Sequence, residues 1–292
     1  MRVGVVILPQ FPVGELRRRW ASLEERGFAH GWTYDHLAWR MLADEPWYST
    51  TITLAAAAQA TSRLRLGTWV ASPNFRHPVT FAKDLLSLDD VSGGRIVAAI
   101  GAGGLGWDSA VLGRPDLPPR QRVDRLAEFV ELTDLLLRQG ETTWHGEYWT
   151  AERARMHPAG SRERIGLVVA GNGTRSVRLA ARYDGWATIG PQGHDDTDSW
   201  WAAVGELVAT HRTAREAQGL DPDGADRYVD ADSVPGFSID HPGAFDEVVD
   251  QARGLGFTDV IVHWPRPADV YVGREESLDR IAARLHDGIW QG

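Results

Sequence analysis

The feature that most constrains this chain is an alternation of short apolar runs with amphipathic stretches, repeated along its whole length. The first apolar run, residues 3–8, shows no polar alternation, which is typical of a strand buried on both faces of a parallel sheet. The stretch after it carries Leu16, Trp20 and Leu23 at helical spacing and ends at Gly27. Strands that alternate with helices predict a parallel α/β fold.

The number of these strand–helix pairs favours a closed barrel over an open sheet. About eight pairs in one chain of 292 residues fit a single (β/α)₈ TIM-barrel domain spanning residues 1–292. Residues 141–164 break the alternation, and we interpret them as an excursion that forms a hairpin, with Trp144 to Trp149 as a lid over the site. The expected strands are 3–8, 31–34, 64–70, 95–100, 165–170, 185–189, 228–239 (the weakest pattern) and 259–263; the expected later helices are 52–61, 79–91, 122–138, 175–183, 199–218, 244–253 and 277–289.

Composition excludes several classes of chemistry and partner. The chain has no cysteine, which excludes disulfides and thiolate chemistry, and Lys83 is its single lysine, which argues against Schiff-base catalysis. The histidines lack metal-ligand spacing, so we expect no metal site. A net charge of −9 disfavours nucleic acid and anionic membranes, so an anionic ligand needs a local binding device. We find no signal peptide or apolar span and expect a cytoplasmic protein.

Candidate catalytic residues follow the strands, because barrel active sites lie at the carboxyl ends of strands. His36 comes directly after the second expected strand, in the pair Asp35-His36. Histidine changes charge near neutral pH, so His36 is a candidate proton donor or acceptor. The alternative is a histidine that hydrogen-bonds a loop carbonyl.

Two glycine-containing loops are candidate cofactor contacts. The first follows the fourth expected strand, where repeated glycines let the backbone approach a ligand closely and Trp107 offers a wall for a flat ring system. The second lies between a strand and a helix and has the make-up of a phosphate cradle. The alternative for the first loop is that its glycines only provide positive φ values. The alternative for the second is that it only caps the start of the helix. The candidate residues are Gly101, Gly103, Gly104, Ala170, Gly171, Asn172, Gly173 and Thr174.

Trp107 is a candidate substrate contact, and so are three cationic or titratable residues after other strands. Arg76 follows the third expected strand, and His263 and Arg266 follow the last one. Each of these three side chains suits a carboxylate or a phosphate. The alternative for each is a structural role within its loop.

Taken together and in order, the motifs resemble the luciferase-like flavin or deazaflavin oxidoreductases. The resemblance covers nearly the whole chain, which makes it more specific than any single motif. The segments that carry it are Leu23–Phe28, Gly31–His36, Arg65–Thr68, Arg76–Pro78, Leu88–Arg95, Ala170–Arg175 and Leu179–Trp186.

The resemblance implies a (β/α)₈ barrel that binds reduced FMN or F420, and it implies a homodimer. It places His36 near the reactive edge of the ring and makes Asp35 a cofactor contact. Trp69 and Val70 match the place where many members have a non-prolyl cis peptide that supports the ring. The loop from Gly101 to Gly104 would pass along the cofactor, and Gly171 to Thr174 would hold its phosphate.

The segment Gly67–Arg76 is most similar to the F420-dependent branch, which includes the glucose-6-phosphate dehydrogenases. The chain departs from those dehydrogenases, because Gly104 stands in place of their acidic residue and Gln192 in place of their phosphate-binding lysine. A sugar phosphate and the same acid–base pair are therefore not expected.

We predict F420-dependent hydride transfer to or from a small organic substrate, with the substrate and the direction left open. The first alternative is an FMNH₂-dependent monooxygenase that uses O₂ and a partner flavin reductase. The second is a non-catalytic flavin- or deazaflavin-binding protein.

Overall fold

The computed structural model describes the chain except for residues 105–106, 158–164 and 291–292. Within the described residues, no helix combines the length and the apolar character needed to cross a membrane. The predicted α/β architecture is confirmed.

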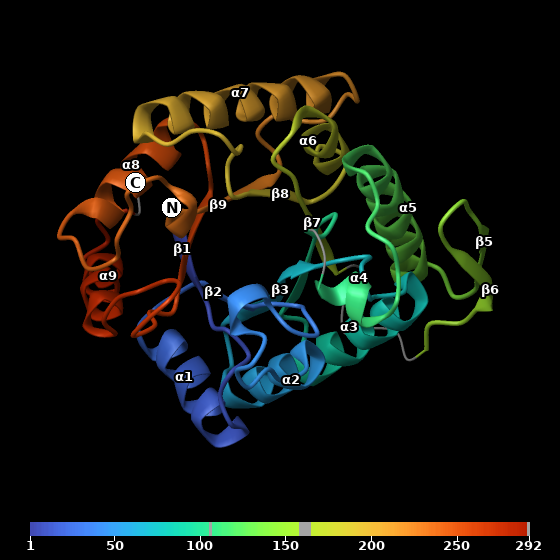
Figure 1. The fold of residues 1–292 in the computed structure, drawn as a ribbon, viewed down its shortest axis with the longest axis horizontal. Helices are drawn as coiled ribbons and strands as arrows, with labels where there is room; N and C mark the ends of the chain where they lie inside the picture. Colours follow the sequence, from blue (N-terminus) through green and yellow to red (C-terminus); the bar gives the residue numbers. More distant parts are fainter. Residues whose placement is uncertain (105–106, 158–164, 291–292) are drawn as a thin grey trace. The chain divides into compact units, whose positions relative to one another are not determined.

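Eight parallel strands close into a barrel in the order β1-β10-β9-β8-β7-β4-β3-β2 (Figure 1). Most of their residues are buried, as expected for strands covered by helices on one face and packed into a core on the other. The strands are β1 (Arg2–Val6), β2 (His30–Thr33), β3 (Arg65–Ala71), β4 (Ile96–Ile100), β7 (Gly166–Ala170), β8 (Gly185–Thr188), β9 (Asp226–Asp230) and β10 (Asp259–His263).

Helices follow the strands in the predicted alternation. Gly27 and Gly93 adopt left-handed φ values of 83° and 67° where the first and third helices end, which is the conformation that favours glycine at helix ends. The helices are α1 (Val13–Glu25), α2 (Thr50–Ala60), α3 (Pro78–Ser92), α4 (Trp107–Val111), α5 (Pro119–Arg138), α6 (Thr174–Ala180), α7 (Thr197–Glu216), α8 (Ala244–Gly254) and α9 (Glu276–His286), with short 3₁₀ helices η1 (Arg40–Leu42) and η2 (Ala231–Ser233).

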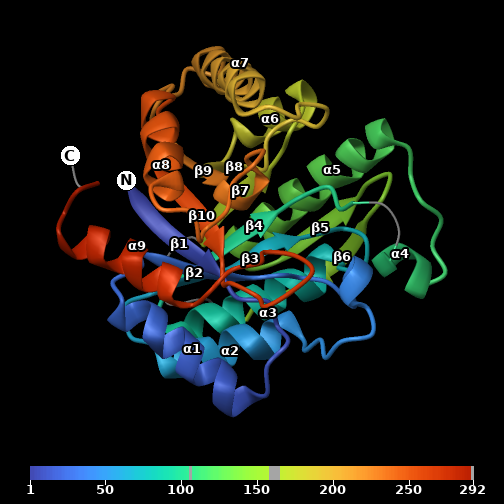
Figure 2. The same cartoon turned by 60° about the vertical axis from the view of Figure 1, so that its left-hand side comes forward.

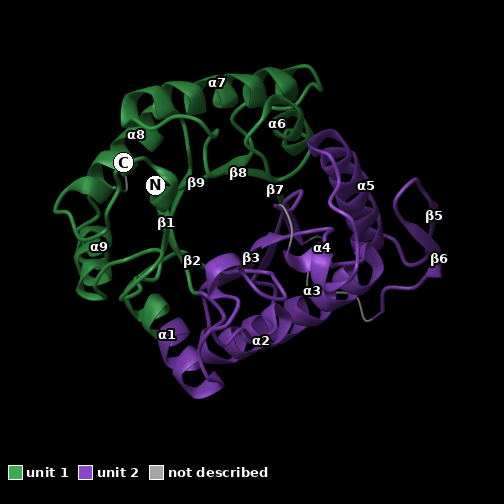
Figure 3. Cartoon of the chain, in the orientation of Figure 1, with its two compact units in different colours: residues 1–7, 22–32, 168–292 green, residues 8–21, 33–167 purple. Residues whose placement is uncertain are grey.

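The chain divides into two compact units (Figure 3). Unit 1 contains residues 1–7, 22–32 and 168–292, and unit 2 contains residues 8–21 and 33–167. Each unit is therefore built from separate stretches of sequence. The single-domain assignment of residues 1–292 stays a prediction.

In unit 1, a buried charged network lies at the amino-terminal ends of the strands. Asp259 accepts from Nε of Arg2 at 2.8 Å and lies 2.9 Å from Nε2 of His30, whose Nδ1 accepts from the indole of Trp32 at 2.6 Å. Burial opposes ionisation of Asp259, but the hydrogen bonds and charges of His30 and Arg2 prevail and lower its pKa to about 2. This end of a barrel contributes to stability rather than to catalysis.

The two ends of the described chain lie close together in unit 1. Figure 2 shows the start of β1 near α8 and α9. The amino group of Met1 donates to the carbonyl oxygen of Trp290 at 2.7 Å. Trp290 is 2% exposed, so the segment from the end of α9 to Trp290 is anchored in the core of this unit.

In unit 2, the predicted hairpin is confirmed as β5 (Thr142–His145) and β6 (Thr150–Ala154), which pair antiparallel. The carboxylate of Glu128 on α5 accepts from the indole of Trp144 and from the backbone N–H groups of Glu147, Tyr148 and Trp149. The hairpin thus lies against the outer side of α5 (Figure 1). A segment fixed in this way does not support the predicted lid.

The structure corrects several expected boundaries. The strand expected at residues 228–239 ends at Asp230, because the chain turns there into η2. The helical spacing of Val123, Leu126, Val130, Thr133 and Leu137 predicts that these side chains form the buried face of α5. Leu126, Val130 and Thr133 are buried, but Val123 and Leu137 are half-buried, and Phe129 and Leu136 are buried as well. The helices α4 and η1 were not predicted, because each is too short to carry a periodic pattern.

Candidate functional site

A histidine–aspartate pair occupies the predicted catalytic position in unit 2. Nδ1 of His36 lies 2.7 Å from Oδ2 of Asp108, and the backbone N–H of Leu37 donates to Oδ1 of the same carboxylate at 2.7 Å. Because a carboxylate only accepts, the hydrogen of the first bond is on Nδ1. The indole of Trp47 donates to the carbonyl oxygen of His36 at 2.9 Å and fixes the loop from the other side.

The pair borders a pocket of about 110 Å³. The side chain of His36 is 22% exposed, whereas that of Asp108 is 3% exposed. Within the described residues, Nε2 of His36 has no hydrogen-bond partner, so it is available to a bound molecule. The pocket is lined by His36, Ala38, Trp39, Arg40, Asn74, Gly104, Trp107 and Asp108.

Sequence reasoning missed Asp108. We looked for an acid at the position of Gly104, but the acid comes four residues later, on the five-residue helix α4. The available signal was an acidic residue directly after Trp107, and only the folding of this segment onto the loop of His36 reveals its partner. Trp107 is 49% exposed and lines the pocket, as the predicted wall for a ring requires.

The glycine loop after β4 is held by side chains from two other elements. Nδ2 of Asn74 donates to the carbonyl oxygen of Gly104 at 3.1 Å, and Arg125 on α5 donates to Oδ1 of Asn74 at 2.5 Å. Gly103 has φ 77°, and a Cβ there would lie 2.4 Å from Asn74, so this position requires glycine. Asn74, which we did not predict as a site residue, positions the loop.

The structure gives Asp35 and Arg76 partners within the protein. Both carboxylate oxygens of Asp35 accept from Arg76, at 2.6 and 3.0 Å, and Arg76 also donates to Asp84 at 3.1 Å. Burial disfavours the charged guanidinium of Arg76, but these carboxylates prevail and raise its pKa. Asp35 is fully buried, and neither residue lines the pocket. Their cofactor and substrate contacts stay predictions.

The peptide bond between Trp69 and Val70 in β3 is cis, as the resemblance implied. Trp69 is 5% exposed, and β3 changes register against β4 between Thr68 and Ala71. The hydroxyl of Thr68 donates to the carbonyl oxygen of Ala99 at 2.8 Å within that irregularity. The support of a ring by Trp69 and Val70 stays a prediction.

In unit 1, the loop from Ala170 to Thr174 joins β7 to α6. Oδ1 of Asn172 accepts from Oγ1 of Thr188 at 2.9 Å and from the N–H of Ile189 at 3.1 Å, both at the end of β8. Within the described residues, the amide nitrogen of Asn172 and the hydroxyl of Thr174 have no hydrogen-bond partner. Gly173 is exposed with open space at its Cβ position. The exposed groups of this loop are therefore donors, which suits an anion.

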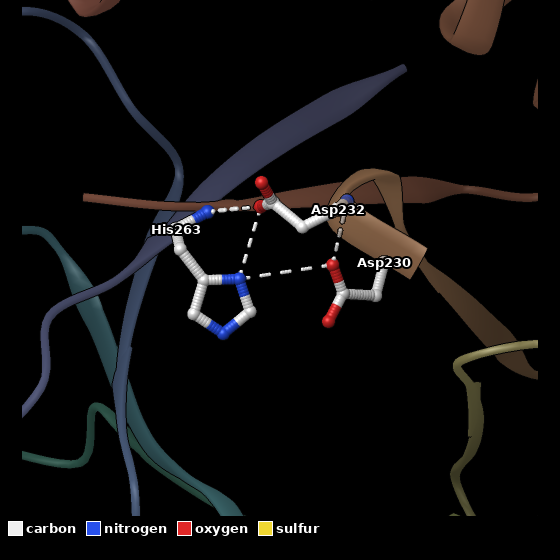
Figure 4. Close-up of side chains that lie close together, drawn as sticks. All are labelled: Asp230, Asp232 and His263. Atoms are coloured by element: carbon white, nitrogen blue, oxygen red, sulfur yellow. Dashed lines mark hydrogen bonds and ion pairs between the residues drawn. The ribbon is translucent and has the colours of Figure 1, made fainter. Parts of the chain in front are cut away.

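His263, a predicted substrate contact, is buried in unit 1 beside the carboxylates of Asp230 and Asp232 (Figure 4). Its Nδ1 lies 3.0 Å from Asp232 and 3.8 Å from Asp230, and its ring stacks on Tyr271 with the ring centroids 3.6 Å apart. Burial disfavours the charged imidazole, but the two carboxylates prevail and raise its pKa.

The same cluster has the composition of a cation site, because ligand atoms of Asp230, Asp232 and His263 lie within 4.8 Å of one another. Arg266, three residues after the end of β10, forms an ion pair with Asp269 at 3.8 Å. The absence of a metal site and the substrate contacts of His263 and Arg266 stay predictions.

Comparison with known proteins gives relatives over the whole chain. An uncharacterised protein of Mycobacterium tuberculosis (strain ATCC 25618 / H37Rv) is 34% identical over 146 residues, which are 49% of this chain and 49% of that protein. This chain thus spans about half the length of that relative. The F420-dependent hydroxymycolic acid dehydrogenase of the same strain is 27% identical over 302 residues, covering 99% of this chain and 77% of that protein.

Solved structures agree with the fold. An F420-dependent secondary alcohol dehydrogenase, in complex with an F420-acetone adduct, superposes with a TM-score of 0.80 and 17% identity, and the match covers 97% of both chains. At that identity the likeness shows the fold alone. Residues 1–232 match the family model described as luciferase-like monooxygenase. The chain therefore belongs to the luciferase-like monooxygenase family.

Proposed function

We propose that this protein transfers a hydride between F420 and a small organic substrate. The observation that carries the proposal is the pair of His36 and Asp108 at a pocket in unit 2, with Nε2 of His36 available to a ligand. The similarity of the chain, over 99% of its length, to an F420-dependent dehydrogenase supports the choice of cofactor.

His36 supplies the proton transfer of the reaction. When an alcohol is oxidised, its C–H and O–H bonds break and a C=O bond forms; Nε2 of His36 accepts the hydroxyl proton, and the reverse reaction returns it. When bound, the deazaflavin would supply the hydride acceptor or donor of this reaction. A histidine serves in either direction because an imidazole nitrogen can both accept and donate a proton.

Asp108 positions His36 rather than contacting the substrate. Its carboxylate holds the hydrogen on Nδ1 and so directs the lone pair or the second hydrogen of Nε2 to the pocket. It also stabilises the imidazolium that forms when Nε2 accepts a proton. The bond from the N–H of Leu37 keeps the carboxylate itself in place.

The residues present fit a deazaflavin by their chemistry. In unit 2, the loop with Gly103 and Gly104 and the exposed Trp107 offer backbone and a flat side chain at the pocket. In unit 1, Asn172 and Thr174 offer neutral donors for a phosphate. We assign the phosphate of the cofactor to Gly171 to Thr174, with Ala170 at the end of β7 beside them.

An FMNH₂-dependent monooxygenase is the second candidate, because the matching family model carries that description. A glycine loop and a set of phosphate donors serve FMN as well as F420. This reading requires O₂ as co-substrate and a flavin reductase as partner. We expect a homodimer under either reading.

The first test is binding of F420 and of FMN to the purified protein, side by side, followed by quenching of tryptophan fluorescence. Trp39 and Trp107 line the pocket, so a ligand there changes their emission. Tight binding of F420 and weak binding of FMN is the expected result. Tight binding of FMN alone moves the protein to the monooxygenase class, and binding of neither contradicts both assignments.

The second test separates proton transfer from cofactor binding. Replacement of His36 by Ala is expected to lower turnover about 10²-fold or more, since general acid–base catalysis contributes that much. The affinity for F420 is expected to change little. Unchanged turnover of H36A would reject the role of His36.

A further inference from the structure

Arg40 is the charged residue of the His36 pocket that lacks a carboxylate partner within the described part of the chain. Two further lining residues can carry a charge, Asp108 and His36, and they are paired with each other. The guanidinium carbon of Arg40 lies 5.4 Å from the ring centroid of Trp39, which also lines the pocket. An aromatic contact of this kind holds a guanidinium while leaving its N–H donors free.

The backbone at Arg40 is specialised for this placement. Arg40 opens η1 with φ 42°, a left-handed conformation that is uncommon for residues other than glycine. Such conformations cost free energy, persist where the surroundings hold them and gather at ligand sites. Leu42, 1% exposed, anchors the turn in the core, so that Trp39 and Arg40 both line the pocket.

We propose that Arg40 binds the carboxylate of a small organic acid whose hydroxyl- or keto-bearing carbon lies at Nε2 of His36. This inference rests on the proposed function and names its substrate class. In the oxidation, the carbon loses a hydride to F420 and the hydroxyl loses its proton to Nε2 of His36, while the carboxylate stays bound to Arg40. A guanidinium presents two parallel donors that match the two oxygens of a carboxylate.

The net negative charge of the chain means that an anionic substrate has to be recognised by a local cation. A net charge of −9 repels anions at long range, so an anionic substrate requires a cation within the pocket. A single guanidinium suits a monoanion better than a dianionic phosphate. The only lysine, Lys83, donates to the carbonyl oxygens of Arg155 and His157 and does not line this pocket. A pocket of about 110 Å³ admits a short acid.

The test compares two probes that differ only in charge, lactate and lactamide. Their binding to the protein without cofactor is measured by ligand-observed NMR, so that the readout does not depend on F420. The variants are Arg40→Gln and, as a control with the same change of charge, Arg18→Gln on the exposed surface of α1. F420 binding is measured on the same preparations.

We expect the wild type and R18Q to bind lactate about tenfold more tightly than lactamide, as for a charge-assisted hydrogen-bonded pair that is open to solvent. This preference is expected to vanish in R40Q and to weaken with added salt in the wild type, because the guanidinium is exposed. Equal affinities for the two probes, or a preference that survives in R40Q, would overturn the proposal.

The failure of this inference is distinguishable from the failure of the proposed function. F420 binding without a lactate preference removes the assignment of Arg40 and leaves hydride transfer in place. A lactate preference that depends on Arg40, in a protein that does not bind F420, supports the anion site and rejects the cofactor. No binding of either probe up to about 100 mM, which is weaker than about −1.4 kcal/mol, also overturns the anion site.

Discussion

Acid sensitivity of folding is expected to depend strongly on His211, a fully buried residue of α7 in unit 1. Its ring stacks on Trp186, with the ring centroids 5.3 Å apart and the planes inclined by 20°. Neither ring nitrogen has a hydrogen-bond partner within the described residues. Burial first, and then the charges of Arg227 and Arg215, lower the pKa of His211 to about 4.

The direction of the effect follows from the two pKa values. The unfolded chain binds a proton at His211 with a pKa of 6.5, whereas the folded protein does so only at about 4. The neutral ring contributes no pH dependence well above 6.5, and stability is lost as the pH falls from there toward 4. The full difference corresponds to about 3 kcal/mol, of which about 2 kcal/mol is lost between about pH 7 and pH 5.

The perturbation is replacement of His211 by Phe and, separately, by Leu. Both variants remove the titrating ring and its two unpaired nitrogens, which alone cost about 1–3 kcal/mol when buried. Two sizes are needed because Phe is larger than His and can overpack the site beside Trp186. The matched control is His145→Leu on the hairpin, where the side chain is 67% exposed.

The assay is urea unfolding at a series of pH values, from which the free energy of unfolding is extrapolated for each variant. We expect both His211 variants to lose about 2 kcal/mol less than the wild type between about pH 7 and pH 5. The control is expected to follow the wild type. A His211 variant with the same pH dependence as the wild type would refute the reasoning, whatever its stability at neutral pH.

Three further predictions follow from single contacts. Gly4→Ala is expected to lower the free energy of unfolding by about 2–4 kcal/mol, because the new Cβ would lie 1.8 Å from Nδ1 of His30. Two hydrogen bonds hold the His30 ring in place. An unchanged melting temperature would contradict this prediction. Asp108→Asn is expected to lower turnover about 10²-fold, with unchanged F420 affinity and no further loss when combined with H36A; additive losses in the double variant would show that Asp108 acts independently. Glu128→Gln is expected to speed amide hydrogen exchange at the hairpin turn, with little change in global stability. The reason is that the NH₂ group of the new carboxamide would face the backbone N–H donors of the turn. Unchanged exchange there would reject the role of Glu128.

Sequence periodicity predicted the elements well wherever burial repeats regularly. The strands at the start and end of the barrel and the helices α3, α7 and α8 lie within a few residues of their expected positions. The exception, residues 228–239, shows why the pattern fails. Val234 and Ile239 are buried as an apolar strand would be, yet they follow η2 in a loop, because burial in a loop leaves the same apolar signature as burial in a strand.

The site was predictable in part for a related reason. His36 stood out because it follows a strand, and in a barrel every strand end faces the same side. Arg76 stood out by the same rule, but its guanidinium is held by Asp35 and Asp84. Position along the chain identifies which residues are near a site, whereas ion pairing decides which of them remain available to a ligand.

The sequence by itself determined the class of fold, the family and the histidine at the pocket, because these depend on local patterns of burial and on motifs that are continuous in the chain. Tertiary structure alone decided that Asp108 is the partner of His36, that Asn74 holds the glycine loop and that Arg40 has no counter-ion among the described residues. Those properties depend on distances between side chains far apart in sequence. Such distances are set by the packing of the elements and leave no periodic trace in the residues themselves.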